Sequence, residues 1–98
     1  MIACGSDGVI SVISNAFPGI FAAMVDSALE GNFNNAKYHN DLLLDVHKWL
    51  YIEGNPVGIK AALHILGWCE DLVRLPLWPL SSQNKQHLRE AIRHLSPL

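Results

Sequence analysis

The amino-terminal part of the chain holds one short run that is almost continuously apolar. Residues 9–13 read Val-Ile-Ser-Val-Ile and follow four turn residues, Gly5-Ser6-Asp7-Gly8. β-Branched residues next to turn signals favour a strand, and near-continuous apolarity is typical of a strand covered on both faces in a parallel sheet. The pattern therefore predicts a strand over residues 9–13. No second strand is predicted after it, although a buried strand needs hydrogen-bonding partners on both sides.

The rest of the chain shows apolar residues at helical spacing. Pro18 suits a first helical turn and Gly31 suits a left-handed stop, so these two residues bound the first helix. Asn32 is a suitable cap for the next one. The pattern predicts helices over residues 18–30, 32–52 and 55–66, and a last helix that begins at Ser81 or Ser82. The predicted fold class is therefore mostly α, with one strand and about four helices.

The segment before the last helix is not expected to be helical. It reads Arg74-Leu75-Pro76-Leu77-Trp78-Pro79-Leu80, and two prolines three residues apart interrupt a helix. Its leucines and tryptophan favour an extended segment that packs on a surface.

Four motifs stand out in these segments: Gly5-Ser6-Asp7-Gly8-Val9-Ile10-Ser11-Val12 with Asn15 and Pro18, Glu30-Gly31-Asn32-Phe33, Glu53-Gly54-Asn55-Pro56 with Lys60, and Arg74-Leu75-Pro76-Leu77 with Pro79-Leu80-Ser81. Together they resemble the dihydrodipicolinate synthase and N-acetylneuraminate lyase superfamily. The similarity runs from about Ala3 to His94 in the expected order, and the last two motifs favour the synthase branch. Gly58 departs from the pattern, because the family commonly has proline there, and a looser start of the third helix is expected.

This resemblance implies the carboxy-terminal part of a TIM (β/α)₈ barrel with its C-terminal helical extension. Residues 1–31 would be the last barrel strand and helix, and residues 32–98 a three-helix extension. A whole barrel needs about 250 residues, so most of it is expected upstream of Met1. The missing barrel would supply the partners that the predicted strand lacks.

The resemblance also implies a pyruvate-dependent lyase that condenses pyruvate with aspartate semialdehyde in lysine and diaminopimelate biosynthesis. In the family a barrel lysine forms a Schiff base with pyruvate, and such a lysine must be partly neutral. No lysine of this chain matches that nucleophile, so no catalytic residue is expected and the chain alone should be inactive. All four lie on predicted helices: Lys37, Lys48, Lys60 and Lys85.

Several residues have a simpler interpretation than catalysis. Lys60 is expected to be a snorkelling or ion-paired lysine. Tyr38 and Tyr51 are expected to be packing residues with solvated hydroxyls, not the family's relay tyrosine. The resemblance gives only Ile10 a substrate-binding role, through a backbone carbonyl near pyruvate. The Ile10 side chain itself can equally be a core residue.

The charge and composition narrow the classes of partner. The net charge is −2 with a pI near 6.2, which disfavours nucleic-acid and membrane partners. No apolar run approaches about 20 residues and no basic leader is seen, so a cytoplasmic protein is expected.

Half of the residues are hydrophobic, which suggests faces that meet the remainder of the barrel or another copy. No cofactor is expected, and Cys4 and Cys69 are expected to be unpaired.

The histidines do not predict a metal site. His39 and His47 are eight residues apart, and His87 and His94 are seven apart. Each pair is therefore two helical turns apart, about 10–12 Å along the axis, which is too far for one zinc ion. His87, with Lys85 close by, is expected on a solvated helix face.

Two alternatives stay open at this point. One keeps the fragment but changes the substrate to N-acetylneuraminate or a 2-keto-3-deoxy sugar acid. The other is an independent helical association module, in which the strand pairs with a copy of itself.

Overall fold

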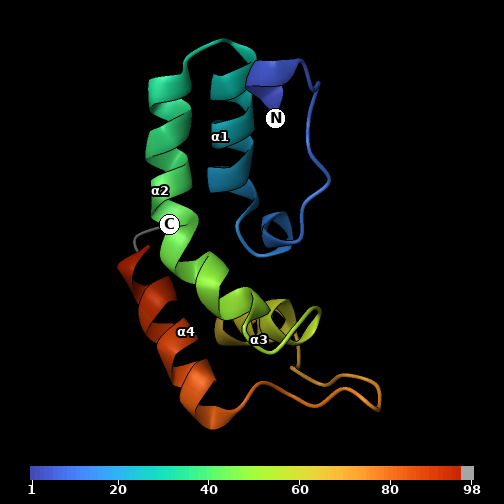
Figure 1. The fold of residues 1–98 in the computed structure, drawn as a ribbon. Helices are drawn as coiled ribbons and strands as arrows, with labels where there is room; N and C mark the ends of the chain where they lie inside the picture. The colour runs from blue at the N-terminus through green and yellow to red at the C-terminus, as the bar shows by residue number, and fades with distance from the viewer. Residues whose placement is uncertain (96–98) are drawn as a thin grey trace. The chain divides into compact units, whose positions relative to one another are not determined.

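The computed structural model describes residues 1–95 (Figure 1). Two compact units divide the chain, one over Met1–Leu43 and one from Leu44 onward. Within the described range there are four α-helices and two short 3₁₀ turns. In chain order they are η1 (Ile2–Cys4), η2 (Ile13–Asn15), α1 (Pro18–Leu29), α2 (Phe33–Tyr51), α3 (Val57–Ile65) and α4 (Ser82–His94).

The four predicted helices are confirmed, and their ends follow the expected capping chemistry. The Asn35 N–H donates to Asn32 Oδ1 at 3.1 Å and so caps the start of α2. The Ser81 hydroxyl likewise accepts from the Asn84 N–H at 3.3 Å at the start of α4. Gly31 has a φ of 81°, the left-handed conformation that stops α1.

The predicted strand over residues 9–13 is wrong for the chain as described. Residues 6–11 have no regular structure, Val9 and Ile10 are exposed, and Ile13 opens the η2 turn. A strand forms only when neighbours accept and donate its backbone hydrogen bonds, and residues 1–95 offer no such neighbour. The Ile10 side chain is fully exposed, so it is not a core residue within this chain.

The first unit buries the residues that lead into α1. Ile13 is almost completely buried, and η2 packs against α1. α1 and the beginning of α2 run side by side after the turn at Gly31 (Figure 1). The Asn35 amide donates to the buried Ser27 hydroxyl at 2.7 Å, which links the two helices and satisfies the one buried polar side chain of this region.

The second unit is built on the last two turns of α2 and on α3 and α4. α3 packs against α4, and the loop before α4 contributes the buried Leu80. The other core residues, from these three helices and the residue after α4, are Val46, Leu50, Val57, Ile59, Ala61, Ala62, Leu88, Ala91, Ile92 and Leu95.

Gly58 allows a backbone-to-backbone contact in this unit. It is buried, and a Cβ added there would lie 2.6 Å from Leu50 Cα and closer still to the Leu50 carbonyl oxygen. The absence of a side chain at Gly58 therefore lets the first turn of α3 approach the end of α2 closely.

None of the helices within residues 1–95 is long and apolar enough to cross a membrane.

Candidate functional site

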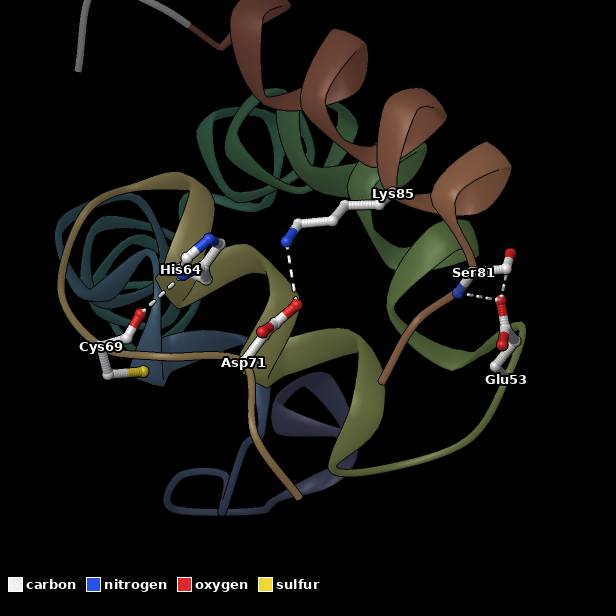
Figure 2. Close-up of polar contacts among 6 residues, drawn as sticks. All are labelled: Glu53, His64, Cys69, Asp71, Ser81 and Lys85. Carbon is white, nitrogen blue, oxygen red and sulfur yellow. Dashed lines mark hydrogen bonds and ion pairs between the residues drawn. The ribbon is translucent and has the colours of Figure 1, made fainter. Parts of the chain in front are cut away.

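The connection between α3 and α4, residues 66–81, is held by polar contacts near both of its ends (Figure 2). We refer to it as the α3–α4 loop. At its start, His64 Nδ1 donates to the Cys69 carbonyl at 3.1 Å. A little further on, Asp71 pairs with Lys85 on α4. At its end, Ser81 bonds to Glu53. Between these contacts the apolar side chains of Leu72, Leu75 and Trp78 are exposed.

The Glu53 carboxylate joins two of the family motifs. Its Oε2 accepts from the Ser81 hydroxyl at 2.8 Å, the Ser81 N–H at 3.1 Å and the Asn84 amide at 2.7 Å. Hydrogen bonds to the ionised form favour it, so the Asn84 amide and then the Ser81 hydroxyl lower the pKa of Glu53. The motif that begins at Glu53 is therefore attached to the motif that ends at Ser81.

Asp71 and Lys85 form the more sheltered of the two ion pairs in the described range. Lys85 Nζ lies 2.9 Å from Asp71 Oδ2, with side-chain exposures of 18% and 22%. The hydrogen bond from Lys85 is the main cause that lowers the pKa of Asp71. The expectation that Lys85 lies on a solvated face is wrong, because its charge is used to hold the α3–α4 loop.

His87 is exposed, as expected for a solvated helix face, and it also contacts Trp49. Its ring stacks on Trp49 at 4.5 Å between centroids and 11° between planes. Lys48 Nζ lies 4.9 Å from the centroid of the same indole. No local sequence pattern predicts this cluster, since Trp49 and His87 come from different helices.

The four lysines of the described chain lie in different surroundings. Lys37 is exposed and pairs with Asp41 at 2.7 Å. Lys85 is occupied by Asp71, and Lys48 is exposed next to Trp49. Lys60 is half-buried and lines a pocket.

The tyrosines lie at the surface. Tyr38 and Tyr51 are 61% and 46% exposed, and each lies against a histidine ring on α2. Partial burial next to Tyr51 lowers the pKa of His47.

Among residues 1–95 no three His, Cys, Asp or Glu side chains gather in a way that would hold a metal ion. Cys4 and Cys69 are both free and exposed.

The segment that contains Ile10 makes few bonds of its own. In the part of the chain that the structure describes, the backbone groups of residues 8–10 take part in no backbone hydrogen bond. Within residues 1–95 the Ile10 carbonyl therefore accepts no backbone hydrogen bond, and the Val9 and Ile10 side chains are exposed.

Glu53 predicts a pH dependence of stability. A carboxyl whose pKa is lowered on folding stabilises the fold above its unfolded value, about 4.3, and this contribution is lost as the pH falls through the folded pKa. Near neutral pH, Glu53→Gln is expected to lower the unfolding free energy by up to about 1 kcal/mol, because solvent screens an exposed carboxylate.

Urea unfolding at pH 7 and at pH 3, followed by circular dichroism, measures this effect. The difference between the parent chain and Glu53→Gln should shrink at pH 3, whereas Glu30→Gln, which removes a carboxyl without such bonds, should change little at either pH. A difference that is the same at both pH values would contradict the role of the charge.

The sequence matches the Dihydrodipicolinate synthetase family over residues 1–95. It is 46% identical over 92 residues to the 4-hydroxy-tetrahydrodipicolinate synthase of Acidithiobacillus ferrooxidans, a match that covers 94% of this chain and 32% of that protein. The same enzyme of Aquifex aeolicus is 42% identical over 93 residues, covering 95% of this chain and 32% of the relative.

Solved structures agree with the sequence match. The crystal structure of dihydrodipicolinate synthase from Aquifex aeolicus superposes with a TM-score of 0.89 at 41% identity, over 94% of this chain and 31% of that one. A structure described as the first monomeric dihydrodipicolinate synthase variant gives 0.93 at 34% identity, over 99% and 32%.

The chain spans about a third of the length of the relatives that it matches. The family match covers residues 1–95, and the contact between Glu53 and Ser81 joins two of the family motifs. These two observations assign the chain to a family. It belongs to the dihydrodipicolinate synthetase family.

Proposed function

We propose that this chain is the carboxy-terminal third of a 4-hydroxy-tetrahydrodipicolinate synthase. The whole protein would condense pyruvate with aspartate semialdehyde, for lysine and diaminopimelate synthesis. Residues 1–31 would supply the last strand and helix of a (β/α)₈ barrel, and residues 32–98 the helical extension. The relatives named above are synthases, which favours this reaction over cleavage of N-acetylneuraminate or a sugar acid, and over an independent association module.

The extended segment before η2 is the observation that carries this proposal. Residues 8–10 combine the exposed β-branched side chains of Val9 and Ile10 with backbone groups that take part in no backbone hydrogen bond within residues 1–95. Such a segment is costly in isolation and is stabilised when strands on both sides complete its ladder. A barrel wall built by the other two thirds of the protein would do this.

This chain and the rest of the barrel would then contribute different groups to the active site. The Schiff-base lysine would come from the rest of the barrel, because the lysines of this chain are exposed, paired or at a surface pocket. Ile10 would contribute its backbone carbonyl near the bound pyruvate, where an oxygen can orient a protonated amine. The role belongs to the backbone, so the side chain is free to vary.

A chimera tests the proposal. In the Acidithiobacillus ferrooxidans synthase, the 92 matched residues are replaced by this chain. The chimera is expected to condense pyruvate with aspartate semialdehyde and to form one pyruvate adduct on treatment with borohydride, located by mass spectrometry. The isolated chain should show neither activity nor adduct.

Two controls make the result specific. The same synthase without the 92 residues should be inactive, and Ile10→Ala in the chimera should retain activity because the carbonyl is kept. A borohydride-trapped adduct on Lys37, Lys48, Lys60 or Lys85 would contradict the division of chemistry. A chimera that folds as its parent does but has no synthase activity would overturn the proposed function.

A further inference from the structure

Two cations from separate motifs line one pocket of the second unit. Lys60 lies in the first turns of α3, and Arg74 begins the two-proline motif of the α3–α4 loop. The pocket has a volume of about 450 Å³, within the usual range for small-molecule sites. Its other lining residues are apolar: Pro56, Leu72, Val73 and Leu77.

No acidic side chain of the described residues lines this pocket beside its two cations. Within residues 1–95 neither Lys60 nor Arg74 belongs to an ion pair. Two carboxylates of the same unit are engaged elsewhere, Glu53 with the start of α4 and Asp71 with Lys85, and no carboxylate lines the pocket. Two like charges that share a pocket repel each other, and an anion between them would relieve that repulsion.

The two side chains differ in what they can recognise. A guanidinium offers a planar pair of donors that fits a carboxylate in a bidentate way, whereas an ammonium acts as a compact point charge. Lys60 is half-buried and lies next to apolar walls, where charge-assisted bonds are less screened than in open solvent. The walls would contact the body of a ligand whose charged end meets the cations.

We propose that this pocket binds a small organic carboxylate with a compact apolar body. The carboxylate lies between Lys60 and Arg74, and the body rests on Leu72, Val73 and Leu77. This binding does not depend on the lyase function proposed above, because every lining residue belongs to the second unit. Inorganic phosphate, which has the charge but no apolar surface, binds more weakly.

The test is a titration of the chain with 3-phenylpropionate, followed by amide and arginine side-chain signals in nuclear magnetic resonance spectra. We expect saturable shifts of Lys60, Arg74 and the leucines of the pocket. The neutral analogue 3-phenylpropanol and inorganic phosphate serve as comparison ligands, and both should give weaker binding. Equal binding of the alcohol would show an apolar surface without anion recognition and would overturn the proposal.

Substitutions of Lys60 and Arg74 test whether ligand binding requires their positive charges. Lys60→Gln and Arg74→Gln should each weaken 3-phenylpropionate binding by at least about fivefold, and raising the salt concentration should weaken binding to the parent chain. Arg89→Gln removes an exposed cation of α4 that is outside the pocket and should leave affinity unchanged. Helical circular dichroism checks that each variant is folded. Absence of saturable binding, or affinity insensitive to both pocket variants, would overturn the proposal.

Discussion

Replacing Leu88 with alanine is expected to lower the unfolding free energy by roughly 2–5 kcal/mol. Leu88 is completely buried on α4, which packs against α3. The substitution removes apolar contacts and leaves a cavity that the neighbouring side chains fill only in part. Domains of this size have a total stability of about 5–15 kcal/mol, so the variant should lose much of its helical structure near physiological temperature.

Thermal and urea unfolding followed by circular dichroism at 222 nm (a helix wavelength) measures the change. Leu88→Met keeps the volume and should cost less than about 1.5 kcal/mol. Gln86→Ala changes an exposed residue of the same helix and should stay within about 0.5 kcal/mol. Equal effects for Leu88→Ala and Gln86→Ala would contradict the burial of Leu88.

Gly58→Ala is expected to destabilise the second unit by about 1–3 kcal/mol, although alanine is normally the better helix former. The added methyl group would meet the backbone of Leu50, which cannot rotate away as a side chain can. The start of α3 must therefore shift from the end of α2 or the last turn of α2 must open. The same measurements as for Leu88→Ala detect this.

Gly19 provides a matched control. It is the second residue of α1, as Gly58 is of α3, and an added Cβ there would meet nothing within 4 Å. Gly19→Ala should therefore stabilise the chain by roughly 0.5–1 kcal/mol. The two substitutions should have opposite signs. A stabilising Gly58→Ala would show that α3 does not approach Leu50 as closely as described.

The helices were predictable because their signals are local. Pro18, Gly31, Asn32 and Ser81 each act on the turn of chain next to them, so the sequence alone indicates where a helix begins or stops. The strand prediction failed for the opposite reason. Residues 9–13 have a strand's composition, but a ladder depends on neighbours that no local pattern can provide.

The polar contacts of the candidate site were less predictable. Glu53 and Ser81 are 28 residues apart, and Lys85 and Asp71 are 14 apart. Nothing in the surrounding sequence specifies that these pairs meet, because the route of the α3–α4 loop decides it. The family motifs did identify Glu53, Lys60, Arg74 and Ser81 as members of a pattern, and the structure adds which of them share a contact or a pocket.

The surroundings of the three tryptophans determine which spectroscopic signal can follow unfolding. Trp68 and Trp78 are about three-quarters exposed in the α3–α4 loop, so their emission in the folded chain already resembles that of indole in water. Only Trp49, stacked on His87, has an environment that unfolding would change substantially. The change in intrinsic fluorescence on unfolding therefore comes mainly from Trp49. Trp68 and Trp78 add an emission that stays nearly constant.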